Sequence, residues 1–218
     1  MNTEILNFLS ELKENNNKDW FDSNRARYKE LREYFIDQIA ILIDKVAEFD
    51  PIVKLEDPRK SVFRINRDIR FSNDKSPYKT NFGGYIVPGG KKGGGAGYYL
   101  HFEPNSSFIG GGIYCPPNPT LKRIRWGIYQ NIDEFLPIIS EKEFKKAFGG
   151  IVGSKLVNPP KGFDKDFEHI DLLKFKDYNV IVNFEDKQIV KDDFIDKVVD
   201  YFKKMISFNQ FLNKVVEE

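Results

Sequence analysis

The sequence predicts one α+β domain, residues 1–218, in which a mainly antiparallel sheet is covered by a long helix and a C-terminal helix. Three observations indicate this class. A chain of 218 residues with 40% hydrophobic content and 20 Phe can bury a full core. Long apolar stripes at helical spacing lie toward both ends of the chain, and segments that alternate like strands lie between them.

Helical periodicity begins near the N-terminus and predicts a first helix through Leu12, which the Asn15–Asn17 run ends. A second helix of about six turns should begin near Asp22 or Asn24 and end before Pro51. Further helices are expected from Asn118 and in the ranges 135–139, 144–148 and 194–206.

Strand-like alternation predicts extended segments over 82–87, 98–103, 108–114 and 178–184. The first three are joined by short connections, which favours an antiparallel meander because parallel pairing needs longer crossovers. The glycine-rich stretch 88–97 between two of them has neither P-loop spacing nor a dinucleotide fingerprint, and we interpret it as a mobile hairpin loop. The cofactor, if there is one, is therefore unknown.

The segment 61–79 concentrates charge where a fifth strand is predicted. Phe63, Ile65, Ile69 and Phe71 alternate as a core face, and the opposite face would carry Arg64, Asn66, Asp68 and Arg70. Arg67 breaks this alternation. From Arg64 to Lys79 the segment holds five cations and two anions, so local pairing leaves three positive charges unmatched.

These cations predict a site that recognises an anion, most simply a phosphorylated small molecule, with phosphoester chemistry as an extension. Pro77 excludes a central strand at its own position and places its neighbours on a loop. The candidate ligand-binding residues are Arg64, Asn66, Arg67, Arg70, Lys75, Tyr78, Lys79 and Arg125.

Two alternatives stay open. In the first, the charged residues form a structural Arg/Asp network in a non-catalytic protein-interaction domain. In the second, the domain is a nucleic-acid-binding module in which Arg125, Lys91 and Lys92 extend the patch and Tyr78 is exposed for stacking.

Catalytic residues remain unknown, and the candidates are Asp68, Asp74, His101 and Glu103. His101 and Glu103 share a strand face with Tyr99, and the two aspartates have the oxygen atoms that a divalent metal prefers. No recognisable metal-ligand spacing is present, so no metal site is predicted. Cys115, followed by two prolines and without an adjacent histidine, is not expected to be a nucleophile, and His169 is interpreted as a surface residue at a helix start.

A formal net charge of +1 excludes a strong overall field, so any electrostatic recognition should be local. The single cysteine fits a reducing compartment, and the N-terminus has no basic region followed by an apolar run. We therefore expect a cytoplasmic protein that does not enter membranes, and the oligomeric state stays open.

Several motifs together resemble one family over nearly the whole chain. They are 15-NNNKDWF-21 with Asn24, Arg25 and Tyr28, the run 63-FRINRDIRFSNDKSPYKT-80, then 97-GYYLH-101 and 160-PKGF-163. This pattern resembles the family catalogued as domain of unknown function 2461, found in bacteria and fungi. The resemblance implies no reaction, ligand or catalytic residue, so the candidates above depend on physical arguments alone.

Overall fold

The computed structural model describes residues 3–91 and 94–217. Its centre is one antiparallel sheet of four strands in the order β1-β2-β3-β4. The strands are β1 (Phe82–Ile86), β2 (Gly97–Phe102), β3 (Ser107–Ile113) and β4 (Tyr178–Phe184). The first three form the predicted meander, and β4 returns to the sheet beside β3 after a long helical segment.

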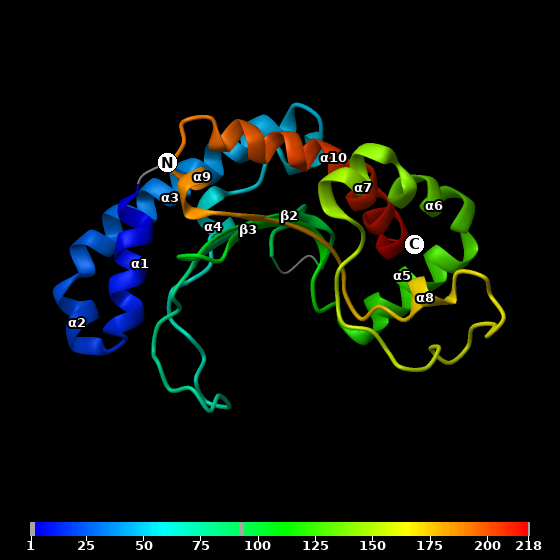
Figure 1. Ribbon diagram of the computed structural model, residues 1–218, viewed down its shortest axis with the longest axis horizontal. Coiled ribbons are helices and arrows are strands. Elements are labelled where there is room, and N and C mark those ends of the chain that lie inside the picture. Colours follow the sequence, from blue (N-terminus) through cyan, green and yellow to red (C-terminus); the bar gives the residue numbers. More distant parts are fainter. Residues whose placement is uncertain (1–2, 92–93, 218) are drawn as a thin grey trace.

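Two long helices, α3 (Arg25–Ala47) and α10 (Phe194–Glu217), cover one face of the sheet (Figure 1). On that face Tyr98 and Phe102 of β2 are 1% exposed. The ring of Phe102 lies 5.4 Å from the ring of Phe35 on α3, and the ring of Tyr98 lies 5.0 Å from the ring of Phe202 on α10. The α+β class and its two covering helices are thus confirmed.

The remaining helices extend the sheet layer at both ends, so the ribbon has the outline of an arch (Figure 1). One end holds α1 (Glu4–Glu14) and α2 (Lys18–Ser23), and the other holds α5 (Asn118–Gln130), α6 (Ile132–Ser140), α7 (Lys142–Phe148) and α8 (Ile170–Leu173). Shorter pieces are the 3-10 turn Pro51–Val53, α4 (Pro58–Ser61) and α9 (Asp186–Ile189). The sequence pattern missed α2, α4 and α9, because pieces of four to six residues are too short to show a helical period.

The predicted strand over 63–71 is wrong. Residues 62–81 make only isolated bridges, Val62 to Gly84 and Asn66 to Tyr78, and the chain doubles back on itself. Phe63 is 39% exposed and Phe71 is 96% exposed, so neither faces the core, whereas Ile65 is buried. The polar side chains bond within the segment instead of leaving the backbone free for a sheet ladder.

Glycines in β3 allow α10 to lie close to the sheet. A Cβ at Gly111 would stand 2.1 Å from Met205 Sδ of α10, and a Cβ at Gly112 would stand 1.9 Å from the carbonyl oxygen of Tyr178. Gly112 also has a φ of 102°, a backbone conformation that residues other than glycine rarely adopt. The glycine run is therefore a packing requirement of this layer.

No helix in the described ranges is both long enough and apolar enough to cross a bilayer.

Candidate functional site

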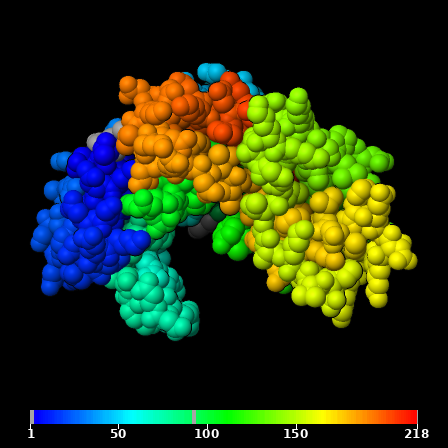
Figure 2. Space-filling view, viewed as in Figure 1, coloured from blue at the N-terminus to red at the C-terminus, as the bar shows by residue number. Residues whose placement is uncertain are grey.

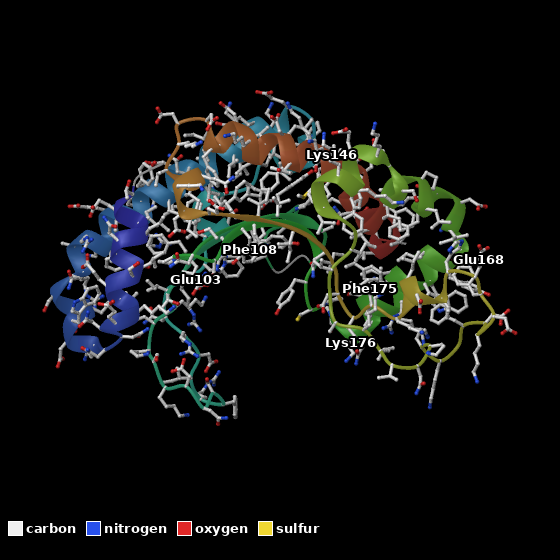
Figure 3. All side chains as sticks on the ribbon, viewed as in Figure 1. Glu103, Phe108, Lys146, Glu168, Phe175 and Lys176 are labelled. Carbon is white, nitrogen blue, oxygen red and sulfur yellow. The ribbon has the colours of Figure 1, made fainter. Side chains whose placement is uncertain are left out.

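The second face of the sheet is not covered by α3 or α10 and looks into a hollow (Figures 1 and 2). We call this face the open face and define it by Tyr99 and His101 of β2, by Glu103 directly after β2, and by Phe108 of β3. Glu103 and Phe108 lie on the hollow side of the sheet (Figure 3). Tyr99, His101 and Glu103 alternate with the buried Tyr98, Leu100 and Phe102, which confirms that the three polar residues share one face.

The hollow, which we call the recess, separates segment 62–81 at one end of the arch from segment 150–177 at the other (Figure 2). It is open to solvent. A surface depression lined by Asn105, Asn183 and Asp186 adjoins the open face, because Asn183 pairs with Phe108 in the β3–β4 register. The recess itself is a broad concave surface (Figure 2).

A chain of hydrogen bonds crosses the open face. The hydroxyl of Tyr99 lies 2.8 Å from His101 Nδ1, and His101 Nε2 lies 3.3 Å from Glu103 Oε2. The other carboxylate oxygen of Glu103 accepts a bond of 2.9 Å from the hydroxyl of Thr80. A neutral imidazole with its proton on Nε2 satisfies this order, with Tyr99 donating to His101 and His101 donating to Glu103.

Burial has the largest effect on the pKa values of His101 and Tyr99. It lowers the pKa of His101, and the opposing effect of the Glu103 carboxylate is smaller. It also raises the pKa of Tyr99 to about 12, with further contributions from the charge of Glu103 and from Tyr114. At neutral pH both Tyr99 and His101 are therefore uncharged, and each retains its place in the chain.

Three cations gather where segment 62–81 meets the open face, and we call Arg64, Lys79 and Lys91 the cation cluster. Lys91 Nζ lies 4.6 Å and Lys79 Nζ lies 5.4 Å from the ring centre of Phe63. The Phe63 ring in turn packs edge-on against Tyr99 at 6.2 Å. Among the described residues none of the three cations forms an ion pair, and of their side chains only that of Lys91 has a hydrogen bond, to the carbonyl oxygen of Val62 at 2.7 Å.

The electrostatics of the cluster are unfavourable in the free protein. Burial lowers the pKa of Lys79, and repulsion from Arg64 adds to this effect. Burial also lowers the pKa of Lys91, with repulsion from Lys79 and Arg32. An anion in front of these groups would relieve both the repulsion and the loss of solvation.

The other charged residues of the motif hold the loop itself, residues 66–78, which we call the braced loop. Arg67 pairs with Asp74 and also donates to the carbonyl oxygen of Ser76 at 3.1 Å. Arg70 binds both carboxylate oxygens of Asp68, at 2.9 and 2.6 Å. Lys75 Nζ donates to the carbonyl oxygen of Ile69 at 3.0 Å.

These contacts lower the pKa values of the two aspartates, Asp74 and Asp68. Bonds from the Ser76 hydroxyl and amide, together with the Arg67 guanidinium, lower the pKa of Asp74 to about 2. The Arg70 guanidinium lowers the pKa of Asp68. The structural-network alternative therefore describes Arg67 and Arg70 well. Arg64 acts on Asp68 only through the weaker attraction of its charge and forms no ion pair with a described residue.

The base of the braced loop is fixed to the N-terminal helices. Asn16 donates to the carbonyl oxygen of Tyr78 at 2.9 Å and accepts from its amide at 3.1 Å. The Tyr78 ring stacks on Phe21 at 3.9 Å and is 6% exposed. Tyr78 is thus part of the core, and the expectation of an exposed stacking ring there is wrong. Asn66 faces Tyr78 across a single backbone bridge.

Arg125 does not join the cluster. Its Nη2 donates to the carbonyl oxygen of Phe175 at 2.9 Å, at the α5–α8 end of the arch. Its Nε is buried without a partner among the described residues. Lys92, which the nucleic-acid alternative included, lies outside the described residues.

The structure therefore divides the candidates. His101 and Glu103 contact each other on the open face, whereas Asp68 and Asp74 bond to arginines within the braced loop. Sequence reasoning missed Thr80 and the aromatic residues Phe63 and Phe108 as parts of this surface, and it included Lys91 only in the nucleic-acid alternative. Lys91 carried a usable signal, since it lies in a glycine-rich loop between two strands, but its approach to Val62 depends on the tertiary fold.

Within residues 3–91 and 94–217 no group of three or more His, Cys, Asp or Glu side chains is placed to hold a metal ion. His169 stands at the N-terminal end of the short helix α8, as expected, and Cys115 is exposed.

Fold and surface together define a class: an α+β domain whose meander sheet is packed by helices on one face and leaves a polar, aromatic face open beside a cluster of cations. The chain belongs to the family of conserved hypothetical proteins DUF2461, whose model matches residues 4–211. No curated protein and no solved structure matches the chain. Membership confirms the resemblance seen in the sequence and assigns no activity.

Proposed function

We propose that this domain binds a phosphate-bearing ligand at the cation cluster, on the rim of its open face. The observation that carries the proposal is the gathering of Arg64, Lys79 and Lys91 without an ion-pair partner among the described residues. Structural charges are normally compensated, as Arg67 and Arg70 are in the neighbouring loop. Guanidinium and ammonium groups are the usual protein ligands of phosphate oxygens.

Binding is better supported than hydrolysis. His101 is the natural acid–base residue of the open face, but both of its ring nitrogens are engaged, by Tyr99 and by Glu103. A general base needs a nitrogen that faces the proton it takes. We therefore assign the Tyr99–His101–Glu103 chain a positioning role, in which it fixes the surface beside the phosphate.

The direct test is thermal unfolding of the protein titrated with inorganic phosphate, pyrophosphate and nucleoside monophosphates at constant ionic strength. A ligand at 100 times its dissociation constant should raise the free energy of unfolding by about 2.7 kcal/mol. Lys79→Met and Lys91→Met should each weaken the effect severalfold, because each removes one charge-assisted contact.

The matched control is Lys146→Met, since Lys146 is exposed on α7 at the outer side of the arch (Figure 3). Arg70→Ala serves as a second control because Arg70 is already paired with Asp68. Stabilisation that survives in the Lys79 and Lys91 variants would place the anion elsewhere. Absence of any stabilisation above matched chloride would refute phosphate recognition.

A further inference from the structure

We infer that the phosphate-bearing ligand is a single-stranded nucleic acid lying across the recess, with its bases on the open face and its backbone on the cations. The inference rests on the proposed function and adds the substrate class. Three features carry it: an aromatic row, the openness of the surface, and cations on both walls.

The first feature is a row of aromatic rings that runs from the cation cluster across the open face. Phe63 lies 6.2 Å from Tyr99, and Tyr99 lies 5.5 Å from Phe108, measured between ring centres. His101 stacks on Phe108 at 4.5 Å with an interplanar angle of 19°. The His101 side chain is 13% exposed, whereas Phe63 is 39% exposed and Phe108 is partly exposed, so the two phenylalanines are the rings that a base can reach. Bases of any sequence stack on such rings, and sheet faces that carry aromatics are a common platform for single strands.

Phe63 links this row to the phosphate contacts. Its ring is 39% exposed, and two ammonium groups approach it at 4.6 and 5.4 Å. A nucleotide that placed its base on Phe63 would hold its phosphate within reach of Lys79 and Lys91. An aromatic ring with cations beside it is complementary to a nucleotide, in which a base is joined to a phosphate.

The second feature is the shape of the surface. Sites for small molecules usually enclose most of the ligand in a cleft. The recess is broad and open to solvent (Figure 2). A chain of nucleotides can accumulate contacts along such a surface, whereas one small phosphorylated molecule would remain largely in water.

The third feature is the charge of the opposite wall. Lys176 lies on the wall formed by segment 150–177 (Figure 3), and Lys155 lies beside it with its Nζ 4.1 Å from the Phe175 ring. Both lysines are exposed, and neither forms an ion pair with any residue that the structure describes. A backbone that crosses the recess would meet cations at both ends of its path.

The Glu103 carboxylate also lies on the open face, and its charge opposes a polyanion. Its two oxygens are engaged by Thr80 and His101, so it presents little free acceptor surface to a phosphate. A duplex would bury its bases and leave the aromatic row without a partner. The arrangement therefore favours single strands, and DNA and RNA share the chemistry that the row and the cations recognise.

The test is fluorescence anisotropy of the full chain with labelled oligothymidylate and oligouridylate of about 12 nucleotides, a length within the range of known single-strand sites. Pyrophosphate, thymidine monophosphate and a duplex of equal length are the comparison ligands. The single strands should bind at least tenfold more tightly than either small ligand. The slope of log K against log salt should lie between about −2 for three phosphate contacts and about −3.5 for five.

Variants separate the two kinds of contact. Phe63→Leu and Phe108→Leu should each weaken binding about fivefold or more without changing the salt slope, because each removes a stacking ring and no charge. Lys79→Met and Lys176→Met should each reduce the slope by about 0.7, and Lys146→Met should leave it unchanged. Phe63 is half-exposed, so its variant should fold even if the Phe108 variant does not.

The outcomes are distinct. Binding of pyrophosphate or the monophosphate as tightly as the 12-nucleotide strand would overturn the inference and leave the proposed function intact. Equal binding of the duplex would overturn the single-strand assignment. Failure of every phosphate-bearing ligand would refute both, and a preference between the two oligonucleotides would identify which nucleic acid the surface takes.

Discussion

Neutralising one member of the cation cluster should stabilise the free protein while weakening its binding of phosphate. In Lys79→Met the side chain keeps its length and apolar stem but loses its charge. The Nζ atoms of Lys79 and Lys91 both lie near the Phe63 ring, at 5.4 and 4.6 Å, so they are no more than about 10 Å apart.

The size of the effect follows from this separation. Two unit charges at about 10 Å repel by about 0.4 kcal/mol in water and about 1.7 kcal/mol at an effective dielectric constant near 20. Arg64 adds repulsion, and loss of the contact between Lys79 and the Phe63 ring removes about 0.5 to 1 kcal/mol of attraction. The net gain in the free energy of unfolding should be about 0.5 to 1 kcal/mol, or about 1 to 4 °C in Tm.

The dependence on pH has a defined sign. The pKa values of Lys79 and Lys91 are lowered in the folded protein, so just below the ordinary lysine value the unfolded chain binds more protons. The free energy of unfolding of the wild type should therefore rise as pH approaches about 10.5, and the rise should be smaller in the variant.

Urea denaturation of wild type, Lys79→Met and the control Lys146→Met across pH and salt provides the measurement. Added salt should stabilise the wild type more than Lys79→Met, since screening weakens the repulsion. If Lys79→Met is less stable than the wild type at neutral pH, or if salt affects both equally, the cations do not repel one another. The physical basis of the proposed site would then fail.

Three further predictions concern the fold. Tyr98→Phe should lower the free energy of unfolding by about 1.5 to 3 kcal/mol in urea, because the Tyr98 hydroxyl donates to the buried Asp50 carboxylate at 2.7 Å. Gly112→Ala should cost about 2 kcal/mol or more in thermal unfolding, because its Cβ would meet the Tyr178 carbonyl at 1.9 Å and its φ is 102°. Arg67→Ala should speed amide exchange and protease cleavage within 66–78 while changing Tm by less than about 2 °C.

A matched variant tests the physical reason given for each of these three predictions. Adding Asp50→Asn to Tyr98→Phe should recover part of the loss, because it removes the unsatisfied charge. Gly149 has a φ of 71°, but a Cβ there would have open space around it. If Gly149→Ala lowers the stability as much as Gly112→Ala does, close packing is not the cause of the loss at Gly112. Arg70→Ala removes the exposed pair with Asp68 and a contact with the Phe71 ring at 5.9 Å, and exchange as fast as in Arg67→Ala would contradict the bracing assigned to Arg67.

Hydrophobic periodicity was sufficient for the covering layer and the sheet. The stripes of α3 and α10 and the alternation in β2 reflect direct packing of Phe35 and Phe202 on Phe102 and Tyr98, so the pattern and the contact have one cause. The same reasoning failed over 63–71. The alternation of Phe63, Ile65, Ile69 and Phe71 is real in the sequence, but Asp74 and Arg67 bond within the loop and draw the backbone out of the sheet.

The charge surplus of that segment was visible in the sequence, but its distribution was not. Counting charges cannot show that Arg67 and Arg70 are paired while Arg64 and Lys79 are not, since pairing depends on how the loop turns. Counting charges also cannot show that Lys91, which belongs to another loop, lies beside Phe63. Recognition of the open face required the layer order, because only the fold shows that α3 and α10 both lie on the face opposite Tyr99 and His101 (Figure 1).

The bracing of residues 66–78 has a consequence for Phe71, whose side chain is 96% exposed. In a flexible loop such a ring would pack against the nearest apolar surface of its own molecule. The contacts of Arg67, Asp74 and Lys75 fix the loop so that the ring remains exposed to water. A partner that buries this ring would contact a loop whose conformation is already fixed. Little conformational entropy is then lost on binding, so even one aromatic side chain can contribute most of its burial free energy to affinity.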